Sequence, residues 1–192
     1  MTKPITVVLF VLMVAAQLAV PSSMIAKREL TLRNGGLYKI RCAPVDPYDA
    51  FRGKYVQLGV QLDGELSWTG KPLLTDQQVY VPIEKDEDGF AVATGITVTK
   101  PESGDFIKAK VSWNSAGVEN TPLSYPFDRY YLEEEIALDA ERAYRSATRD
   151  EEKPAYITVR IRSGFGVIEE LYIADKPLRT YLEEDYNTVN AL

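Results

Sequence analysis

The sequence predicts a mainly β (α+β) protein, with an N-terminal transmembrane helix followed by one antiparallel β-rich domain that forms a sandwich or a small barrel. Three observations predict this class. A charge-free apolar stretch opens the chain, several later segments alternate apolar and polar residues with period two, and one segment near residues 133–149 has the spacing of an amphipathic helix. The length of 192 residues suits one domain behind an anchor. We therefore expect an anchor over residues 1–26 and a single extracytoplasmic domain over residues 27–192.

The N-terminal segment is predicted to cross a membrane. From Pro4 to Ala26 the chain runs 23 residues without a charged side chain. At about 1.5 Å of rise per residue, a helix of this length reaches roughly 33 Å and exceeds a hydrocarbon core of about 30 Å. The alternatives are a cleaved signal peptide and a buried helix of a soluble protein. A signal peptide requires small residues at its cleavage site. Bulky residues crowd the possible cut after Ala26, and Pro21 disturbs the one after Ser23, so a retained anchor is favoured.

Charge is distributed unevenly between the anchor and the remainder. Lys3 is the only charged side chain before residue 27, which leaves 21 basic and 28 acidic residues downstream. An acidic body repels nucleic-acid phosphate, and no basic stripe with interleaved aromatics is present, so no nucleic-acid partner is predicted. Lys27, Arg28 and Arg33, offset by Glu29, follow the apolar stretch, and the positive-inside rule therefore gives no clear orientation. For a bacterial source, the short leading tail favours a body in the periplasm or otherwise outside the cytoplasm.

The composition excludes several kinds of chemistry. The chain has no histidine, which excludes Ser-His-Asp and Cys-His nucleophile pairs as well as imidazole metal sites. Cys42 is the only cysteine, so an intramolecular disulfide and a thiolate zinc cluster are excluded too. The acidic run at residues 86–89 lacks the spacing of a calcium loop and is interpreted as a solvated hairpin turn. No metal and no cofactor is predicted, and a non-enzymatic role is favoured.

Alternation with period two predicts strands over residues 55–62, 79–83, 96–98 and 106–113, separated by glycine-containing turns. A further pair of strands, flanking Ser163-Gly164-Phe165-Gly166, predicts a β-hairpin. The residues expected to face the core are Val56, Leu58, Val60, Leu62, Val79, Val81, Ile83, Ile96, Val98, Ile107, Ala109, Val111 and Trp113.

Residues 133–149 are predicted to form the single helix of the domain. Apolar residues recur there at helical spacing, glutamates open the segment and arginines close it, which complements the helix dipole. The acidic run is interpreted as a solvated face rather than a cation site. The buried face is expected to consist of Ile136, Ala140, Ala143, Tyr144 and Ala147.

The segment from Cys42 to Leu58 has the most individual sequence. Two prolines there fix φ and remove backbone donors, so an ordered loop is predicted to lead into the strand that begins near Lys54. Binding residues tend to collect on loops held by a rigid scaffold. The candidate binding residues are Asp46, Asp49, Arg52, Gly53, Tyr55 and Leu58. The structural alternative for the last three is a turn glycine, a strand aromatic and a core leucine.

This segment resembles the GDYXXLXY family of membrane-anchored proteins. Gly53, Tyr55 and Leu58 match the family motif, whereas Lys54 replaces its aspartate and Val60 its final tyrosine. The Tyr-Pro-Phe-Asp-Arg-Tyr-Tyr stretch at 125–131 and the closing hairpin extend the resemblance over most of the chain. Members of this family are often found beside polytopic membrane proteins, so the resemblance implies a membrane-protein partner. Because the aspartate is replaced, that carboxylate is not an indispensable catalyst in this chain.

The function expected from the sequence is binding or scaffolding at a membrane surface through exposed aromatic residues, together with a polytopic membrane-protein partner. The alternative is a membrane-anchored Ser/Lys peptidase, because Pro21-Ser22-Ser23-Met24-Ile25 resembles the serine box of type I signal peptidases. Its catalytic residue would be Ser23. A lysine base needs a pKa lowered by burial beside the serine, and no segment here resembles the lysine box of that family.

Overall fold

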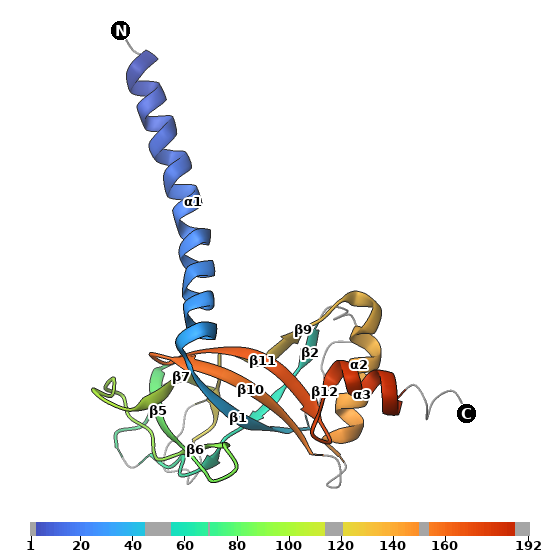
Figure 1. The fold of residues 1–192 in the computed structure, drawn as a ribbon. Coiled ribbons are helices and arrows are strands. Elements are labelled where there is room, and N and C mark those ends of the chain that lie inside the picture. Colours follow the sequence, from blue (N-terminus) through green and yellow to red (C-terminus); the bar gives the residue numbers. More distant parts are fainter. Residues whose placement is uncertain (1–2, 45–54, 69, 114–120, 150–153, 187–192) are drawn as a thin grey trace.

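The computed structural model describes residues 3–44, 55–68, 70–113, 121–149 and 154–186. One long helix, α1 (Lys3–Asn34), projects from a β-rich body, and two short helical segments and a longer helix lie at one end of that body (Figure 1). The predicted class is confirmed: an N-terminal apolar helix precedes antiparallel sheets that carry one amphipathic helix.

Helix α1 is long and apolar enough to cross a membrane. Within Pro4–Asn34, an 18-residue window has a mean hydropathy of 2.2, and none of that window is buried against the body. The helix continues eight residues beyond the end of the apolar stretch at Ala26, and Pro21 does not interrupt it. It ends where the Gly35 amide donates to the Thr31 carbonyl at 2.8 Å. A Cβ at Gly35 would lie 2.5 Å from that carbonyl oxygen, so the turn from helix to strand requires a glycine.

The first sheet has the order β12-β11-β10-β1-β3 and is antiparallel throughout. Strands β1 (Gly36–Ala43) and β10 (Ala155–Arg162) lie at its centre, flanked by β11 (Phe165–Ile173), β12 (Lys176–Pro177) and β3 (Gly59–Gln61). The predicted closing hairpin is confirmed as β10 and β11. Its two-residue turn has φ of 51° at Ser163 and 79° at Gly164, the left-handed pair that matches the twist of hairpin strands.

A second five-stranded sheet has the order β4-β6-β5-β7-β8, and a two-stranded ribbon pairs β2 with β9. The members of the second sheet are β4 (Asp63–Gly64), β5 (Gln78–Lys85), β6 (Ala91–Ala93), β7 (Asp105–Val111) and β8 (Leu123–Ser124). The ribbon consists of β2 (Tyr55–Gln57) and β9 (Arg129–Tyr131). Bridges from Lys39 to Phe90 and from Ile107 to Gly164 join the two large sheets, which curl around a shared hydrophobic cluster.

Three strand predictions need correction. Residues 55–62 were expected to form one strand, but the chain passes there from β2 to β3 and on to β4, each paired in a different sheet. Trp113 was expected to face the core, but β7 ends at Val111 and the Trp113 side chain is 63% exposed. Residues 96–98 form no strand. Only Thr97 bridges to Tyr80, and Val98 is 45% exposed, because no neighbouring segment continues the ladder there.

The predicted helix is confirmed as α2 (Glu134–Ala147), which packs against β2. Glutamates occupy its first turn and an arginine its last turn, as the helix dipole favours. Its buried residues are Ala137, Ala140, Ala143, Tyr144 and Ala147, and Ile136 is half-buried and packs against the hydrophobic cluster. Helix α3 (Leu178–Tyr181) and a π-helical segment (Leu182–Tyr186) follow β12.

Candidate functional site

Two of the six predicted binding residues lie within the part of the chain that the structure describes, and four do not. Asp46, Asp49, Arg52 and Gly53 lie outside the described residues. Tyr55 and Leu58 are described, and they take opposite roles. Leu58 is buried at 3% exposure within the hydrophobic cluster, whereas Tyr55 is half-buried on the two-stranded ribbon. For Leu58 the structural alternative, a core leucine, is therefore what the structure shows.

The segment that carries Tyr55 and Leu58 has an inner side, which faces the hydrophobic cluster and is held by hydrogen bonds from its backbone amides. The Leu58 amide donates to the Asp128 carbonyl at 2.8 Å. The Gly59 amide donates to the Tyr144 hydroxyl at 3.0 Å, and that hydroxyl donates to the Ala43 carbonyl at 3.1 Å. Burial raises the pKa of Tyr144 well above its ordinary value, so the phenol stays protonated and can make both bonds. This buried tyrosine fixes the segment against α2, and it has a structural role.

The outer side of the segment presents an aromatic cluster. Tyr55 of β2 lies opposite Tyr131 of β9, with ring centroids 5.6 Å apart and planes inclined at 56°. The Arg129 guanidinium lies 5.2 Å from the centre of the Tyr55 ring. A hydrogen bond to Tyr131 is the main cause that raises the pKa of Arg129. Tyr131 is 67% exposed. We call these three residues, Tyr55, Arg129 and Tyr131, the tyrosine ribbon.

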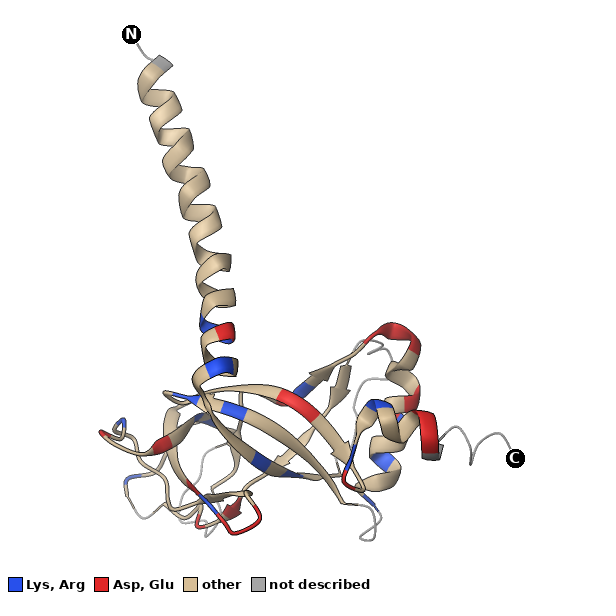
Figure 2. Cartoon of the chain, in the orientation of Figure 1, with Lys and Arg blue, Asp and Glu red and all other residues tan. Residues whose placement is uncertain are grey.

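A surface depression of about 440 Å³ connects the tyrosine ribbon with the foot of α1. One wall is formed by residues 126–131 and another by residues 165–169 of β11, and Arg28 of α1 contributes to the rim. Figure 2 shows that α1 carries no charge along most of its length and that charged residues gather where it meets the body. A ligand in this depression would therefore lie beside the point at which α1 leaves its apolar stretch.

A second cavity, of about 670 Å³, lies at the junction of β1, β10 and the end of α2. The Arg41 guanidinium covers the Phe90 ring at 4.0 Å and also pairs with Asp63 at 2.7 Å. Burial raises the pKa of the Cys42 thiol, which lines this cavity, to about 12. Because the thiolate is the nucleophilic form, this raised pKa lowers the reactivity expected of Cys42 at neutral pH.

The serine of the peptidase alternative lies on the exposed, apolar part of α1. Its hydroxyl donates to the Val20 carbonyl at 2.7 Å. Lys27, one helical turn further on, directs its amine over the Phe165 ring at 4.1 Å. Within the described part of the chain, no hydrogen bond joins Ser23 to a lysine amine, so the dyad required by a Ser/Lys peptidase is not assembled.

Among the described residues, no group of three acidic or cysteine side chains could hold a metal ion. The Asp86 carboxylate instead accepts from the amides of Asp88 and Phe90, at 3.0 and 2.7 Å, and closes the turn between β5 and β6. The interpretation of this acidic run as a hairpin turn is confirmed.

Two members of the tyrosine ribbon, Arg129 and Tyr131, were not among the residues that the sequence predicted. They lie more than 70 positions from Tyr55, and the pairing of β2 with β9 is what brings them together. The signal for them in the sequence is the aromatic stretch at 125–131, which extends the family resemblance but does not by itself indicate a binding site.

Fold and surface together define a class: β-rich proteins with an N-terminal helix long and apolar enough to span a membrane. The chain belongs to the GDYXXLXY family. The family model described as GDYXXLXY protein matches residues 17–171, which covers most of the chain from the second half of α1 into β11. Searches of curated proteins and of solved structures find no match to this chain.

Proposed function

We propose that the chain is a membrane-anchored, extracytoplasmic binding or scaffolding protein, without enzymatic activity, that holds a polytopic membrane-protein partner at the tyrosine ribbon. The observation that carries this proposal is the surface pair of half-buried Tyr55 and exposed Tyr131, with Arg129 stacked beside it. Tyrosine and arginine are the residue types enriched where proteins bind one another, because each combines a large contact area with a polar end.

The position of the ribbon supports a partner in the same membrane. The depression beside it reaches Arg28, two residues after the apolar stretch of α1 ends. A partner seated there would lie next to the membrane surface, where the loops of a polytopic protein emerge. The described groups with strongly raised pKa values are tyrosines and the Cys42 thiol, which burial keeps neutral, and such groups suit a structural role better than acid–base chemistry.

The test is a crosslinking pull-down of the full-length protein from native membranes, with partners identified by mass spectrometry. The wild type is compared with a Tyr55→Ala/Tyr131→Ala variant and with Trp113→Ala, which removes an exposed aromatic residue outside the ribbon. We expect one integral membrane protein to be enriched with the wild type and the control and lost with the double variant. Equal recovery with all three proteins would reject the ribbon as the binding surface.

The unfolding transition of each variant is measured in parallel. A double variant that unfolds at the wild-type midpoint and still loses the partner has lost a contact surface, whereas one that unfolds early has lost its fold. Arg129→Ala provides a second test, because it removes the stacked cation while both tyrosines remain.

A further inference from the structure

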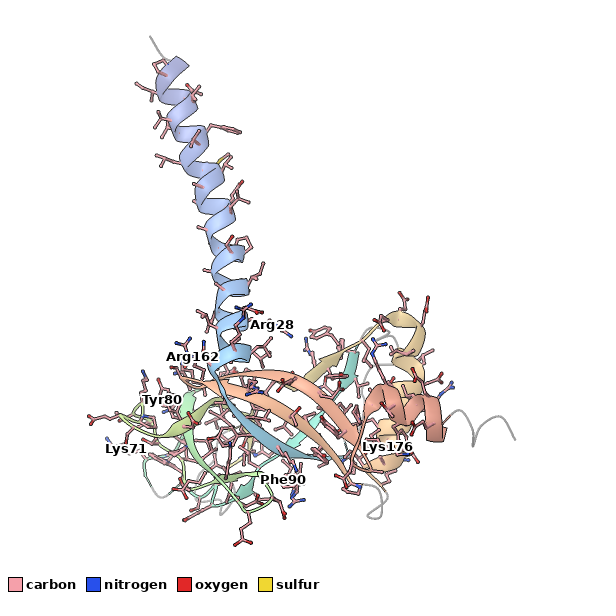
Figure 3. All side chains as sticks on the ribbon, in the orientation of Figure 1. Arg28, Lys71, Tyr80, Phe90, Arg162 and Lys176 are labelled. Carbon is pink, nitrogen blue, oxygen red and sulfur yellow. The ribbon has the colours of Figure 1, made fainter. Side chains whose placement is uncertain are left out.

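The tip of the β10–β11 hairpin lies against the foot of α1. Lys27 of α1 places its amine 4.1 Å from the centre of the Phe165 ring at the start of β11. The same tip is fixed from the body side, since the Lys108 amide donates to the Gly164 carbonyl at 3.0 Å. Arg28 and Arg162 appear on either side of the helix foot in Figure 3. Segments more than 130 residues apart in sequence thus meet where the apolar stretch of α1 ends.

These segments bring together four cations, namely Lys27, Arg28, Lys108 and Arg162. Within the part of the chain that the structure describes, none of the four forms an ion pair. We call these four residues and Phe165 the hairpin collar. Its positive character contrasts with the chain as a whole, which has a formal net charge of −6.

The acidic groups around the collar are largely engaged elsewhere. Glu29 pairs with Arg33 at 2.6 Å on the same helix. Asp105 accepts a hydrogen bond from the Tyr38 hydroxyl at 2.7 Å. Glu102 and Asp105 line a neighbouring polar depression together with Lys100 and Arg162, without forming an ion pair that involves Arg162 among the described residues. The local balance therefore leaves an excess of cationic groups at the foot of the helix, of which Lys27, Arg28 and Arg162 are exposed and Lys108 is half-buried.

The position of the collar follows from the continuity of α1. Lys27 is the first charged residue after the apolar stretch, and the helix continues without a break through it to Asn34. A spanning α1 therefore places Lys27 at the boundary between hydrocarbon and water. Because the Lys27 amine contacts Phe165, the hairpin tip lies at the same level. Lysine and arginine side chains suit this boundary, because their apolar stems lie along apolar surface while their charged ends reach water.

We propose that the hairpin collar binds the phosphates of anionic phospholipid headgroups in the leaflet from which α1 emerges. Guanidinium groups bind phosphate through paired hydrogen bonds, and anionic leaflets attract basic residues close to the membrane surface. The collar thereby fixes the rotation of the body about α1 and determines which face lies toward a neighbouring membrane protein. This proposal rests on the membrane anchoring in the proposed function but not on the tyrosine ribbon or on its partner.

The test uses full-length protein in nanodiscs of phosphatidylcholine alone or of phosphatidylcholine with phosphatidylglycerol. Hydrogen exchange is followed in peptides that cover residues 160–168. We expect slower exchange with phosphatidylglycerol than with phosphatidylcholine alone. The variant Arg28→Ala/Arg162→Ala removes two exposed cations and should reduce this protection by about fivefold for each cation removed. The control Lys71→Ala/Arg142→Ala removes two exposed cations elsewhere and should leave the protection intact. Arg28→Lys/Arg162→Lys should restore most of it.

Equal exchange in both kinds of nanodisc, or an equal loss in the control, would overturn the proposal. Soluble glycerol phosphate added to phosphatidylcholine nanodiscs separates a free phosphate from a headgroup. Full protection by the soluble compound would assign the collar to a free ligand and overturn the lipid assignment. Extraction of the wild type by alkaline carbonate would reject the anchoring itself and with it both proposals, whereas retention with no lipid effect rejects the collar alone.

Discussion

The two sides of the segment that carries the family motif differ in what they contact. On the inner side, Leu58 is buried and the adjacent Gly59 amide is held by the Tyr144 hydroxyl. On the outer side, Tyr55 pairs with the exposed ring of Tyr131. The two motif residues are only three positions apart, yet Leu58 packs in the hydrophobic cluster and Tyr55 contacts Tyr131 at the surface. The motif therefore combines a packing requirement with a surface feature, and substitutions on the two sides should have separable effects.

The largest effect is expected for the inner side. Leu58→Ala removes a side chain that is 3% exposed in the shared hydrophobic cluster, and the cavity left behind should lower the free energy of unfolding by about 2–5 kcal/mol. Chemical denaturation of the full-length protein measures this loss. The control is Leu138→Ala on α2, whose side chain is 60% exposed and whose loss should change stability by about 0.5 kcal/mol or less. Equal losses in the two variants would contradict the assignment of Leu58 to the core.

The inner side should also make the protein sensitive to alkali. Burial raises the pKa of the Cys42 thiol from 9.0 to about 12. The unfolded chain therefore loses this proton first as the pH rises, so the stabilisation is complete below pH 9 and is lost progressively between pH 9 and 12. Its size should be about 2–4 kcal/mol. Tyrosines with raised pKa values contribute to the same trend above pH 10.

A Cys42→Ala variant isolates the contribution of the thiol. Its free energy of unfolding should fall less steeply than that of the wild type between pH 9 and 10, before the tyrosines of the unfolded chain ionise. Parallel curves for the two proteins over this interval would show that the thiol is not protected by burial. An independent check is alkylation at neutral pH, which should be slow in the folded protein and fast in denaturant.

Sequence periodicity predicted which residues of the motif segment are buried on its inner side, but it did not predict which residues meet on its outer side. Val56, Leu58 and Leu62 are buried as their alternation indicated, because burial depends on which face of a segment a residue occupies. The same pattern did not show that residues 55–62 divide between two sheets before the chain enters a third at Asp63, since strand partners are set by contacts distant in sequence. On α2 the helical spacing also indicated the buried face, since Ala140, Ala143, Tyr144 and Ala147 are buried and Ile136 packs against the hydrophobic cluster.

The candidate surface was harder to predict, because it is assembled by pairing rather than by spacing. Tyr55 was identified through its motif, but Arg129 and Tyr131 become its neighbours only when β9 aligns with β2. The hairpin collar has the same origin, since Lys27 and Phe165 belong to opposite ends of the chain. Asp46, Asp49, Arg52 and Gly53 lie outside the described residues, and their role as binding residues stays a prediction.

A smaller effect on stability is expected for the outer side. Tyr55→Ala/Tyr131→Ala removes a cross-strand aromatic pair in which Tyr55 is half-buried and Tyr131 exposed, which should cost about 1 kcal/mol of unfolding free energy or less. Thermal or denaturant unfolding provides the measurement, with Leu58→Ala as the sensitive reference. If the double variant were as unstable as Leu58→Ala, the ribbon would be part of the structural core, and the contrast between the two sides would be wrong.

The smallest effect is expected for Ser23→Ala, which tests the peptidase alternative directly. The Ser23 hydroxyl donates to the Val20 carbonyl within α1, and the amine of Lys27 is directed to the Phe165 ring. A local serine bond of this kind contributes little to a helix, so stability should stay within about 0.5 kcal/mol of the wild type. Recovery of the crosslinked partner should not change, and cleavage products of co-resident membrane proteins should be the same with either residue.

Products that disappear in Ser23→Ala and also in Lys27→Ala would identify a serine–lysine pair. They would show that Lys27 leaves Phe165 to act as a base, in which case the foot of α1 would be catalytic rather than a lipid-binding surface.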